Sequence, residues 1–368
     1  MAGLSTATVA GTIGGSAKMN HYCTYADENY LVQCAALLFS LRRRDPGMTL
    51  WVLALDETAA GAVIALSGGD VRVVTCAELE ADDGALASSR KTRSRIEHIF
   101  TMSPCLPRHI LRRHPDIPAI IYLDADLWFF ANLNEIHQEW AAGSLYLTRQ
   151  DVPRCLRERE ERYGRYNVGI LGFRNNATAL ACLDWWRERC LEWCKNVPEP
   201  GLYADQKYLD VWPERFRGVV VSNHPGINVA PWNWSQRQLA VDGPEPTAAG
   251  RPLIAFHFAQ LRRLSRRCID TNQVQYGVMP FRLRAPIYGQ YIEALDTASG
   301  RLAKAGQLAP LGSVRPRSEA GLQRWGFAIV FGTVWVRLGR WWFSSGFGLG
   351  RHSGRIMTWQ HRLRGKPA

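Results

Sequence analysis

Apolar strands that alternate with amphipathic helices are the feature that most narrows the possible folds of this 368-residue chain. The first half predicts four apolar strands, with a helix over 30–44 after the first strand and another helix from Asp56 after the second. A strand that returns through a helix lies parallel to the strand before it, so this alternation predicts a parallel sheet. The predicted strands are 19–26, 48–55, 71–74 and 119–123. We therefore expect an α/β fold.

The second half continues this pattern and ends in a segment of different composition. Before strand 119–123, residues 93–113 predict a basic, amphipathic helical stretch. Further predicted elements are strands 166–173 and 253–258 and helices 177–194 and 204–212. After about residue 295 the chain is rich in glycine, arginine and aromatic residues, which indicates a boundary. The predicted division is a flexible N-terminus over 1–18, one α/β domain over 19–295 and a C-terminal extension over 296–368.

The net charge of +12 is concentrated in the C-terminal extension. From residue 301 onward there are twelve lysines and arginines against one acid, Glu319, so the rest of the chain is close to neutral. A nucleic-acid-binding domain would carry its basic face on the fold itself, and we therefore expect no nucleic-acid partner. Residues 325–336 carry no charge and lie between Arg324 and Arg337, a pattern typical of contact with an anionic membrane surface. Packing of a C-terminal helix on the body is the alternative.

Cysteine spacing and the start of the chain bear on the compartment. The nine cysteines are an odd number without zinc-site or disulfide spacing, which predicts reduced and mostly buried side chains. Residues 1–18 lack the charged start and apolar stretch of a signal peptide, and no run of about 18 apolar residues predicts a spanning helix. We expect a cytoplasmic protein, held at the inner face of the membrane if the extension binds lipid.

Two carboxylates, Asp124 and Asp126, directly follow the apolar strand 119–123. Open α/β sheets bind ligands at the carboxyl ends of their strands, so these side chains are expected at a site. Divalent cations such as Mg²⁺ take oxygen ligands from one or two carboxylates and from substrate phosphates. The spacing therefore predicts a metal site for a diphosphate substrate. Two acids in a surface loop would produce the same local pattern.

Further motifs occur in an order that resembles the retaining GT-A glycosyltransferases of family 8, relatives of glycogenin and of bacterial lipopolysaccharide sugar transferases. The first motif is Ala-Asp-Glu-Asn-Tyr at 26–30, after the first strand. The resemblance implies that Asp27 and Asn29 hydrogen-bond the base or ribose of a UDP-sugar and that Tyr30 stacks on the base. It also implies that Asp124 extends toward the ribose. Helix capping by the polar residues and core packing by the tyrosine are the local alternatives.

Two more motifs follow in the order of this family. Asn167 lies in the predicted strand 166–173 and is similar to an asparagine beside the donor sugar. Asp205 and Gln206 are similar to an Asp-Gln pair at a helix start. The resemblance implies that Asp205 holds donor-sugar hydroxyls and that Gln206 lies under the anomeric carbon. A strand-edge amide at Asn167 and a helix-dipole partner at Asp205 are the local alternatives.

His257 ends the last predicted strand, where the family's third metal ligand is expected. The implied metal set is therefore this histidine with the two aspartates, although a histidine between aromatic residues also suits a core position. The basic segment that follows the histidine in the family is replaced here by residues 259–263. Arg262 and Arg263 are the candidates there for neutralising the leaving diphosphate, and Arg90 is another phosphate candidate. Each of these arginines would also suit the solvated surface.

The resemblance implies a GT-A fold, which is a mixed, mainly parallel sheet with helices on both faces. It also implies a Mn²⁺- or Mg²⁺-dependent enzyme that moves a sugar from a UDP-sugar to a glycan or lipid-linked acceptor, with retention, as in cell-envelope polysaccharide synthesis. Segments 224–228 and 231–234 combine amides with tryptophans and are expected to form the acceptor wall. A haloacid-type phosphatase also places two aspartates after a strand, but its motif normally lies near the chain start. A sugar-binding or membrane scaffold on an inactive transferase fold is the non-enzymatic alternative.

Overall fold

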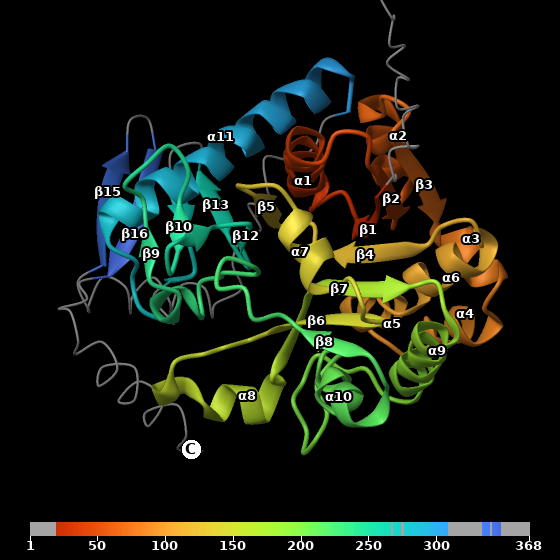
Figure 1. Ribbon diagram of the computed structural model, residues 1–368. Coiled ribbons are helices and arrows are strands. Elements are labelled where there is room, and N and C mark those ends of the chain that lie inside the picture. Colours follow the sequence, from red (N-terminus) through yellow and green to blue (C-terminus); the bar gives the residue numbers. More distant parts are fainter. Residues whose placement is uncertain (1–19, 266–267, 274–275, 308–332, 339–340, 347–368) are drawn as a thin grey trace, which may run out of the picture.

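A computed structural model describes residues 20–265, 268–273, 276–307, 333–338 and 341–346 (Figure 1). Its centre is a seven-stranded sheet in the order β3-β2-β1-β4-β7-β6-β8. Six strands run in one direction, and β7 runs antiparallel to both of its neighbours. The strands are β1 (His21–Ala26), β2 (Thr49–Ala54), β3 (Val71–Thr75), β4 (Ala119–Leu123), β6 (Leu145–Arg149), β7 (Tyr166–Arg174) and β8 (Val219–Val221). The mixed, mainly parallel sheet predicted for a GT-A fold is confirmed.

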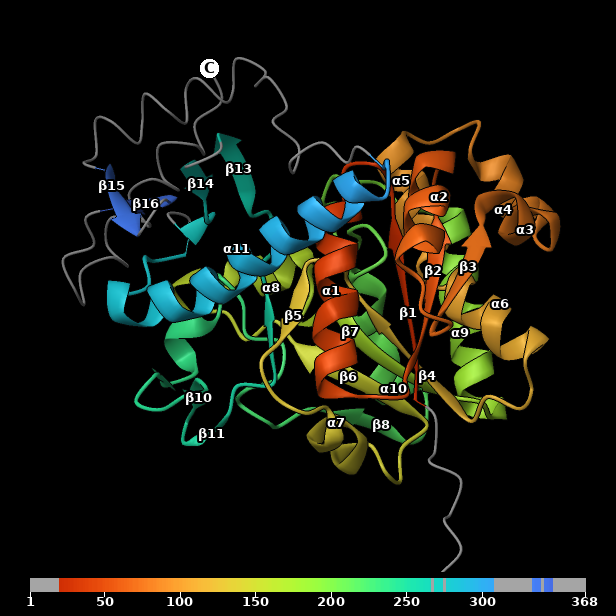
Figure 2. The same cartoon turned by 90° about the horizontal axis from the view of Figure 1, so that it is seen from above.

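Helices cover both faces of this sheet, as Figures 1 and 2 show. The helices on one face are α1 (Leu31–Arg44), α2 (Glu57–Leu66) and α11 (Phe281–Lys304), which share one apolar core. The helices on the other face include α5 (Arg95–Met102), α6 (Cys105–Arg113) and α9 (Ala177–Glu192), which contribute to a second core. Successive strand residues point to opposite faces, so Tyr22 lies in the first core and Cys23 in the second. The sheet is therefore buried on both sides.

Local chemistry explains where the helices begin and end. Asp56 accepts a hydrogen bond from the backbone N–H of Ala59 at the start of α2 (2.8 Å). The helical stretch predicted over 93–113 is confirmed, and it consists of two helices, α5 and α6, with a break at Ser103 and Pro104. Proline has no N–H to continue the hydrogen bonds of a helix. The helix predicted over 204–212 is instead a short 3₁₀ helix, η2 (Lys207–Val211), followed by α10 (Trp212–Arg215).

A two-stranded antiparallel sheet outside the main sheet joins two distant parts of the chain. β5 (Leu127–Phe129) follows the two aspartates directly and pairs with β12 (Ala255–His257). In this pairing Leu127 lies opposite His257. The backbone N–H of Phe258 also donates to the carbonyl of Asp126 (2.9 Å). The strand predicted over 253–258 therefore exists, and it brings a histidine to the carboxyl end of β4.

The fold continues past the boundary that the composition predicted near residue 295. α11 runs on to Lys304 and packs against α1. β15 (Thr333–Leu338) pairs with β16 (Trp341–Gly346), and β16 pairs with β14 (Cys268–Asp270), which also pairs with β13 (Arg262–Ser265). One strand of the predicted extension, β16, is therefore hydrogen-bonded to the body, and β15 pairs with β16 alone among the described strands. The predicted N-terminal segment 1–18 and residues 325–332 lie outside the described residues.

The remaining elements are shorter. They are α3 (Cys76–Ala81), α4 (Gly84–Ser89), α7 (Asn134–Glu139), α8 (Glu158–Tyr163), η1 (Arg154–Leu156), η3 (Trp234–Gln236), β9 (Leu239–Ala240), β10 (Thr247–Ala248) and β11 (Arg251–Pro252). Among the helices in the described ranges, none is both long and apolar enough to cross a membrane.

Candidate metal and nucleotide site

Asp124, Asp126 and His257 come together at the carboxyl end of β4. One ligand atom of each residue lies within 4.8 Å of the others. His257 Nε2 is 2.9 Å from Asp126 Oδ1 and 3.5 Å from Asp124 Oδ2. Carboxylate oxygens and an imidazole nitrogen are a ligand set that suits a divalent cation such as Mn²⁺. The structure thus brings the three predicted ligands into one candidate metal site.

The electrostatics of these three groups favour a cation between them. Burial raises the pKa of Asp124 to about 6, and the charge of Asp126 adds to this effect while His257 opposes it. Burial alone would lower the pKa of His257, but the charges of Asp126 and Asp124 raise it above its usual value. The hydroxyl of Tyr122 donates to Asp124 Oδ1 (2.9 Å). Two neighbouring carboxylates repel each other, and a bound cation would remove that repulsion. The residues therefore fit a divalent ion.

Strand β7 closes one side of the candidate metal site. The backbone N–H of Asp124 donates to the carbonyl of Gly169 (2.9 Å). A β-carbon on Gly169 would lie only 2.7 Å from His257 Nδ1 and 2.6 Å from Asn167 Oδ1. The imidazole therefore packs directly on the backbone of β7, which a larger residue at position 169 would prevent.

The predicted nucleotide loop lies at the carboxyl end of β1, the neighbour of β4. Asp27 Oδ1 accepts hydrogen bonds from the backbone N–H groups of Asn29 (3.0 Å) and Tyr30 (3.2 Å). Asn29 Nδ2 donates to Asp27 Oδ2 (3.2 Å), so the aspartate organises the loop. Partial burial and the charges of Asp126 and Asp124 raise the pKa of Tyr30, whose side chain is still 44% exposed. Tyr30 is therefore close to the candidate metal site and open to a ligand.

An arginine that the sequence analysis did not single out also reaches this loop. Arg95 Nη2 is 3.0 Å from Asp27 Oδ2 and 3.4 Å from Asp56 Oδ2. The two aspartates follow β1 and β2, so Arg95 bridges the carboxyl ends of adjacent strands with 60% of its side chain exposed. The only signal in the sequence was the pattern Ser94-x-x-Glu97, which is typical of a helix start and puts Arg95 at the first helical position.

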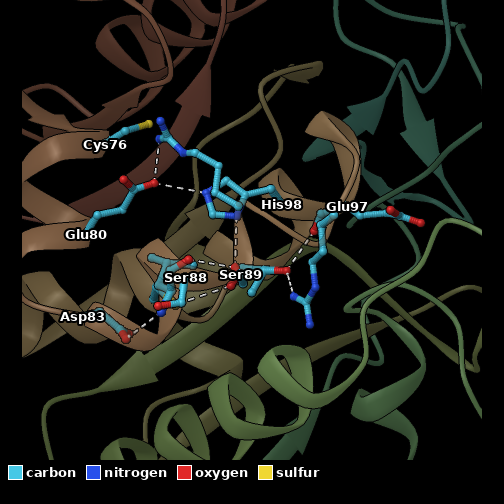
Figure 3. A network of polar contacts seen from close by, with 12 residues as sticks. Cys76, Glu80, Asp83, Ser88, Ser89, Glu97 and His98 are labelled. Atoms are coloured by element: carbon cyan, nitrogen blue, oxygen red, sulfur yellow. Dashed lines mark hydrogen bonds and ion pairs between the residues drawn. The ribbon is translucent and has the colours of Figure 1, made fainter.

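Arg90, the predicted phosphate ligand, pairs with Glu80 at 2.6 Å. The same carboxylate is 3.1 Å from His98 Nε2, and the other ring nitrogen of His98 is 3.1 Å from Ser89 Oγ. Figure 3 shows these contacts as dashed lines. This network links α3, α4 and α5, and it supports the helix that carries Arg95. The role of Arg90 in binding the donor stays a prediction.

The residues predicted beside the donor sugar form a hydrogen-bonded chain. Asn167 Nδ2 donates to Gln206 Oε1 (3.1 Å), and Asn228 Nδ2 donates to Asn167 Oδ1 (3.0 Å). Burial raises the pKa of Asp205 to about 7, and the charge of Asp124 adds to this effect. The structure therefore brings Asn167 and Gln206 into contact and places Asp205 within electrostatic range of the metal site. Their roles toward a sugar stay predictions.

The predicted acceptor wall has two kinds of residue. The first kind consists of buried amides that stabilise the protein itself. Asn233 Oδ1 accepts a hydrogen bond from the backbone N–H of Ala230 in its own loop (2.8 Å), and Asn228 donates to Asn167. Trp232 instead packs edge-on against His257, with ring centroids 5.3 Å apart. Of the segment 231–234, Trp232 thus reaches the metal site.

The two arginines that replace the family's basic segment differ in their surroundings. Arg263 is buried and forms an ion pair with Asp296 of α11 (2.8 Å). Arg262 is exposed, and its positive charge acts to lower the pKa of Tyr30. Arg262 is therefore the better placed of the two to meet a phosphate beside the nucleotide loop.

Among solved structures, the chain is similar to the galactosyltransferase LgtC in complex with donor and acceptor sugar analogs. That similarity has a TM-score of 0.47 at 16% identity and covers 75% of this chain and 95% of LgtC. For mouse xyloside xylosyltransferase 1 the TM-score is 0.44 at 14% identity, over 66% of this chain and 98% of that protein.

Sequence comparison gives a closer relationship. No family model matches the chain. It is 29% identical over 242 residues to the uncharacterized protein YfnD of Bacillus subtilis (strain 168), which covers 65% of this chain and 77% of YfnD. It is 34% identical over 251 residues to the uncharacterized protein YfnF of the same strain, covering 66% of this chain and 82% of YfnF. This chain therefore belongs to the same protein family as YfnF.

Proposed function

We propose that this protein is a metal-dependent glycosyltransferase that takes its sugar from a nucleotide diphosphate donor, with UDP as the nucleotide. The observation that carries the proposal is the convergence of Asp124, Asp126 and His257 at the carboxyl end of β4, beside the loop that follows β1. In open α/β sheets this edge is where ligands bind. Three metal ligands would bind a cation for the diphosphate, and the exposed tyrosine next to them would bind the base.

In this proposal each group on the sheet edge has one task. Asp27 and Asn29 shape the loop and bind the base or ribose, and Tyr30 stacks on the base. A bound Mn²⁺ or Mg²⁺ would supply positive charge to the diphosphate. Arg95 and Arg262 are the exposed arginines on this side that would add to that charge.

The donor sugar would lie over Asn167, Asp205 and Gln206. Asn167 and Gln206 are already hydrogen-bonded to each other, so both amides are held in place before a sugar arrives. Asp205 would accept hydrogen bonds from sugar hydroxyls. Gln206 would lie under the anomeric carbon, and the family resemblance implies that the configuration at this carbon is retained.

A phosphatase of the haloacid type is the rival enzyme. It would use the first aspartate of the pair as a nucleophile, and that carboxylate must be free to attack a phosphorus atom. Here Asp124 accepts a hydrogen bond from Tyr122 and lies 3.5 Å from the imidazole of His257. These contacts favour a metal ligand over a nucleophile.

The test is release of UDP from a panel of UDP-sugars by the purified protein, with Mn²⁺ and without it. We expect slow, Mn²⁺-dependent hydrolysis of at least one UDP-sugar even when no acceptor is added. Release of inorganic phosphate from p-nitrophenyl phosphate, with no UDP release from any donor, would instead support the phosphatase. If the protein catalyses neither reaction, the result would favour the inactive scaffold.

A further inference from the structure

We propose that an aromatic cluster beside the metal site binds a pyranose ring of a glycan acceptor. The aromatic cluster consists of Tyr163, Tyr203, Trp232 and Tyr276, together with the guanidinium group of Arg159. The proposal rests on the proposed function, because an acceptor subsite requires a donor site next to it. It goes further by assigning the chemical class of the acceptor and the side chains that recognise it.

The aromatic cluster is a continuous series of ring contacts. The ring centroids of Tyr163 and Tyr203 are 4.8 Å apart, and the ring planes are nearly perpendicular at 76°. Arg159 Cζ lies 5.5 Å from the centroid of Tyr163 and 4.8 Å from that of Tyr276. Arg159 also donates to the hydroxyl of Tyr276 (3.1 Å). Trp232 extends the series, with its centroid 6.5 Å from that of Tyr276.

Both ends of the aromatic cluster touch residues of the proposed donor site. Trp232 packs against His257, with ring centroids 5.3 Å apart. At the other end, Gln206 Nε2 donates to the backbone carbonyl of Tyr163 (2.9 Å). The metal ligand and the residue expected under the anomeric carbon are therefore both in contact with the cluster. An acceptor held there would lie next to the sugar to be transferred.

The surface of the aromatic cluster has the chemistry that a sugar ring requires. A pyranose has apolar C–H faces and a rim of hydroxyl groups, so it suits rigid ring faces that carry polar tips. Tyr163, Tyr203 and Tyr276 are partly exposed, so a ligand can reach the parts of these residues that Arg159 and Arg162 do not cover. Burial raises the pKa of Tyr203 to about 12, so its hydroxyl stays protonated and can donate a hydrogen bond.

The test is saturation-transfer difference NMR on the full-length protein with UDP and diamagnetic Mg²⁺ present. The probes are the methyl α- and β-pyranosides of glucose and galactose. We expect the ring protons of at least one probe to receive saturation from the wild-type protein. Tyr163→Leu removes the ring and should weaken that probe's binding by about threefold to tenfold. Tyr163→Phe keeps the ring and should bind within about twofold of wild type.

Phe281→Leu is the matched control, because Phe281 is an exposed aromatic residue outside the aromatic cluster and its loss should change nothing. Equal binding by the wild type and Tyr163→Leu, or no binding of any probe by the wild type, would overturn the proposal. If Tyr163→Leu does not fold, Tyr276→Leu takes its place with the same expectation.

Calorimetry of UDP with Mg²⁺ on the same proteins separates this proposal from the proposed function. A wild-type protein that binds no UDP lacks the donor site, and both proposals then fail. UDP binding by the wild type together with pyranoside binding that ignores Tyr163 rejects the aromatic cluster alone.

Discussion

Gly169 determines how closely His257 can approach the two aspartates. The imidazole packs where a β-carbon on residue 169 would be, 2.7 Å from Nδ1. Residues that only orient a metal ligand still change metal affinity by about tenfold to a hundredfold. A single methyl group added at this position should therefore change the affinity of the metal site.

Gly169→Ala should weaken Mn²⁺ binding by at least about tenfold, because the added methyl group pushes the imidazole away from Asp126. Calorimetric titration of Mn²⁺ measures the effect. Gly300→Ala is the matched control, since a β-carbon on Gly300 meets no atom within 4 Å. Unchanged Mn²⁺ affinity in Gly169→Ala would mean that His257 is a core residue and not a ligand.

Asp205 should lower the stability of the protein as the pH rises. Its pKa is raised to about 7 in the folded chain, from an ordinary value of 3.8, so folding favours the protonated form. The free energy of unfolding should therefore fall between about pH 4 and pH 7 through this group and change little above pH 7. Asp205→Asn cannot ionise and should melt higher than wild type at pH 8 in EDTA, with little difference at pH 4. It should also lose UDP-sugar hydrolysis. A lower melting temperature than wild type at pH 8 would contradict the buried charge.

Helix α5 links the nucleotide loop to the second core, which lies on the face of the sheet opposite α1. The helix begins with a capping box at Ser94 and Glu97, and His98 ties it to Glu80 of α3 (Figure 3). Its first residue, Arg95, bridges Asp27 and Asp56. The helix thus holds an arginine at the sheet edge where the nucleotide would bind.

Arg95→Gln should weaken UDP binding by about twofold to fivefold, the range for an exposed ion pair, and leave Mn²⁺ affinity unchanged. Arg95→Lys should recover part of the loss, because it restores the charge without the planar fork. Arg90→Gln is the matched control, since Arg90 pairs with Glu80. A larger loss in Arg90→Gln than in Arg95→Gln would support the original prediction for Arg90 and reject Arg95.

The basic extension can contact either an anionic membrane or the body of the molecule. Twelve basic residues against one acid in residues 301–368 favour an anionic membrane, whereas the pairing of β16 with β14 favours packing on the body. A protein that ends at residue 307 keeps α11 complete and removes β15 and β16.

This truncated protein should still bind UDP with Mn²⁺ and should bind anionic liposomes less than the full chain. Each basic residue near an anionic surface contributes about 1 kcal/mol, so a few engaged arginines are enough for attachment. Liposome sedimentation at low and high salt measures the difference, and salt should weaken binding of the full chain. Equal liposome binding by both proteins, or failure of the shorter one to fold, would assign the extension to the body.

The sequence predicted the parts of this fold that depend on local pattern. The strands that became β1, β2, β3, β4 and β7 follow from their apolar runs, and Asp124 and Asp126 follow from the end of β4. The pairing of β5 with β12 could not be read in this way, because no local periodicity says which distant segment pairs with Leu127. His257 was therefore placed by family resemblance alone, and Arg95 was missed because its partners, Asp27 and Asp56, are distant in the sequence and follow β1 and β2. The break before Pro104 was readable from the proline, but the amphipathic pattern on both sides of it concealed it.

The proposed function requires that Asp124, Asp126 and His257 hold a divalent ion that binds a nucleotide diphosphate. The most direct measurement is calorimetric titration of UDP into the wild type, Asp126→Asn and Asp116→Asn, each with Mn²⁺ and with EDTA. Asp116→Asn makes the same charge change at an exposed loop residue before β4, so it is the matched control. We predict that Mn²⁺ tightens UDP binding at least about tenfold in the wild type and in Asp116→Asn, and has no effect in Asp126→Asn. Equal dependence on Mn²⁺ in all three proteins would mean that Asp126 does not hold the ion that binds the nucleotide.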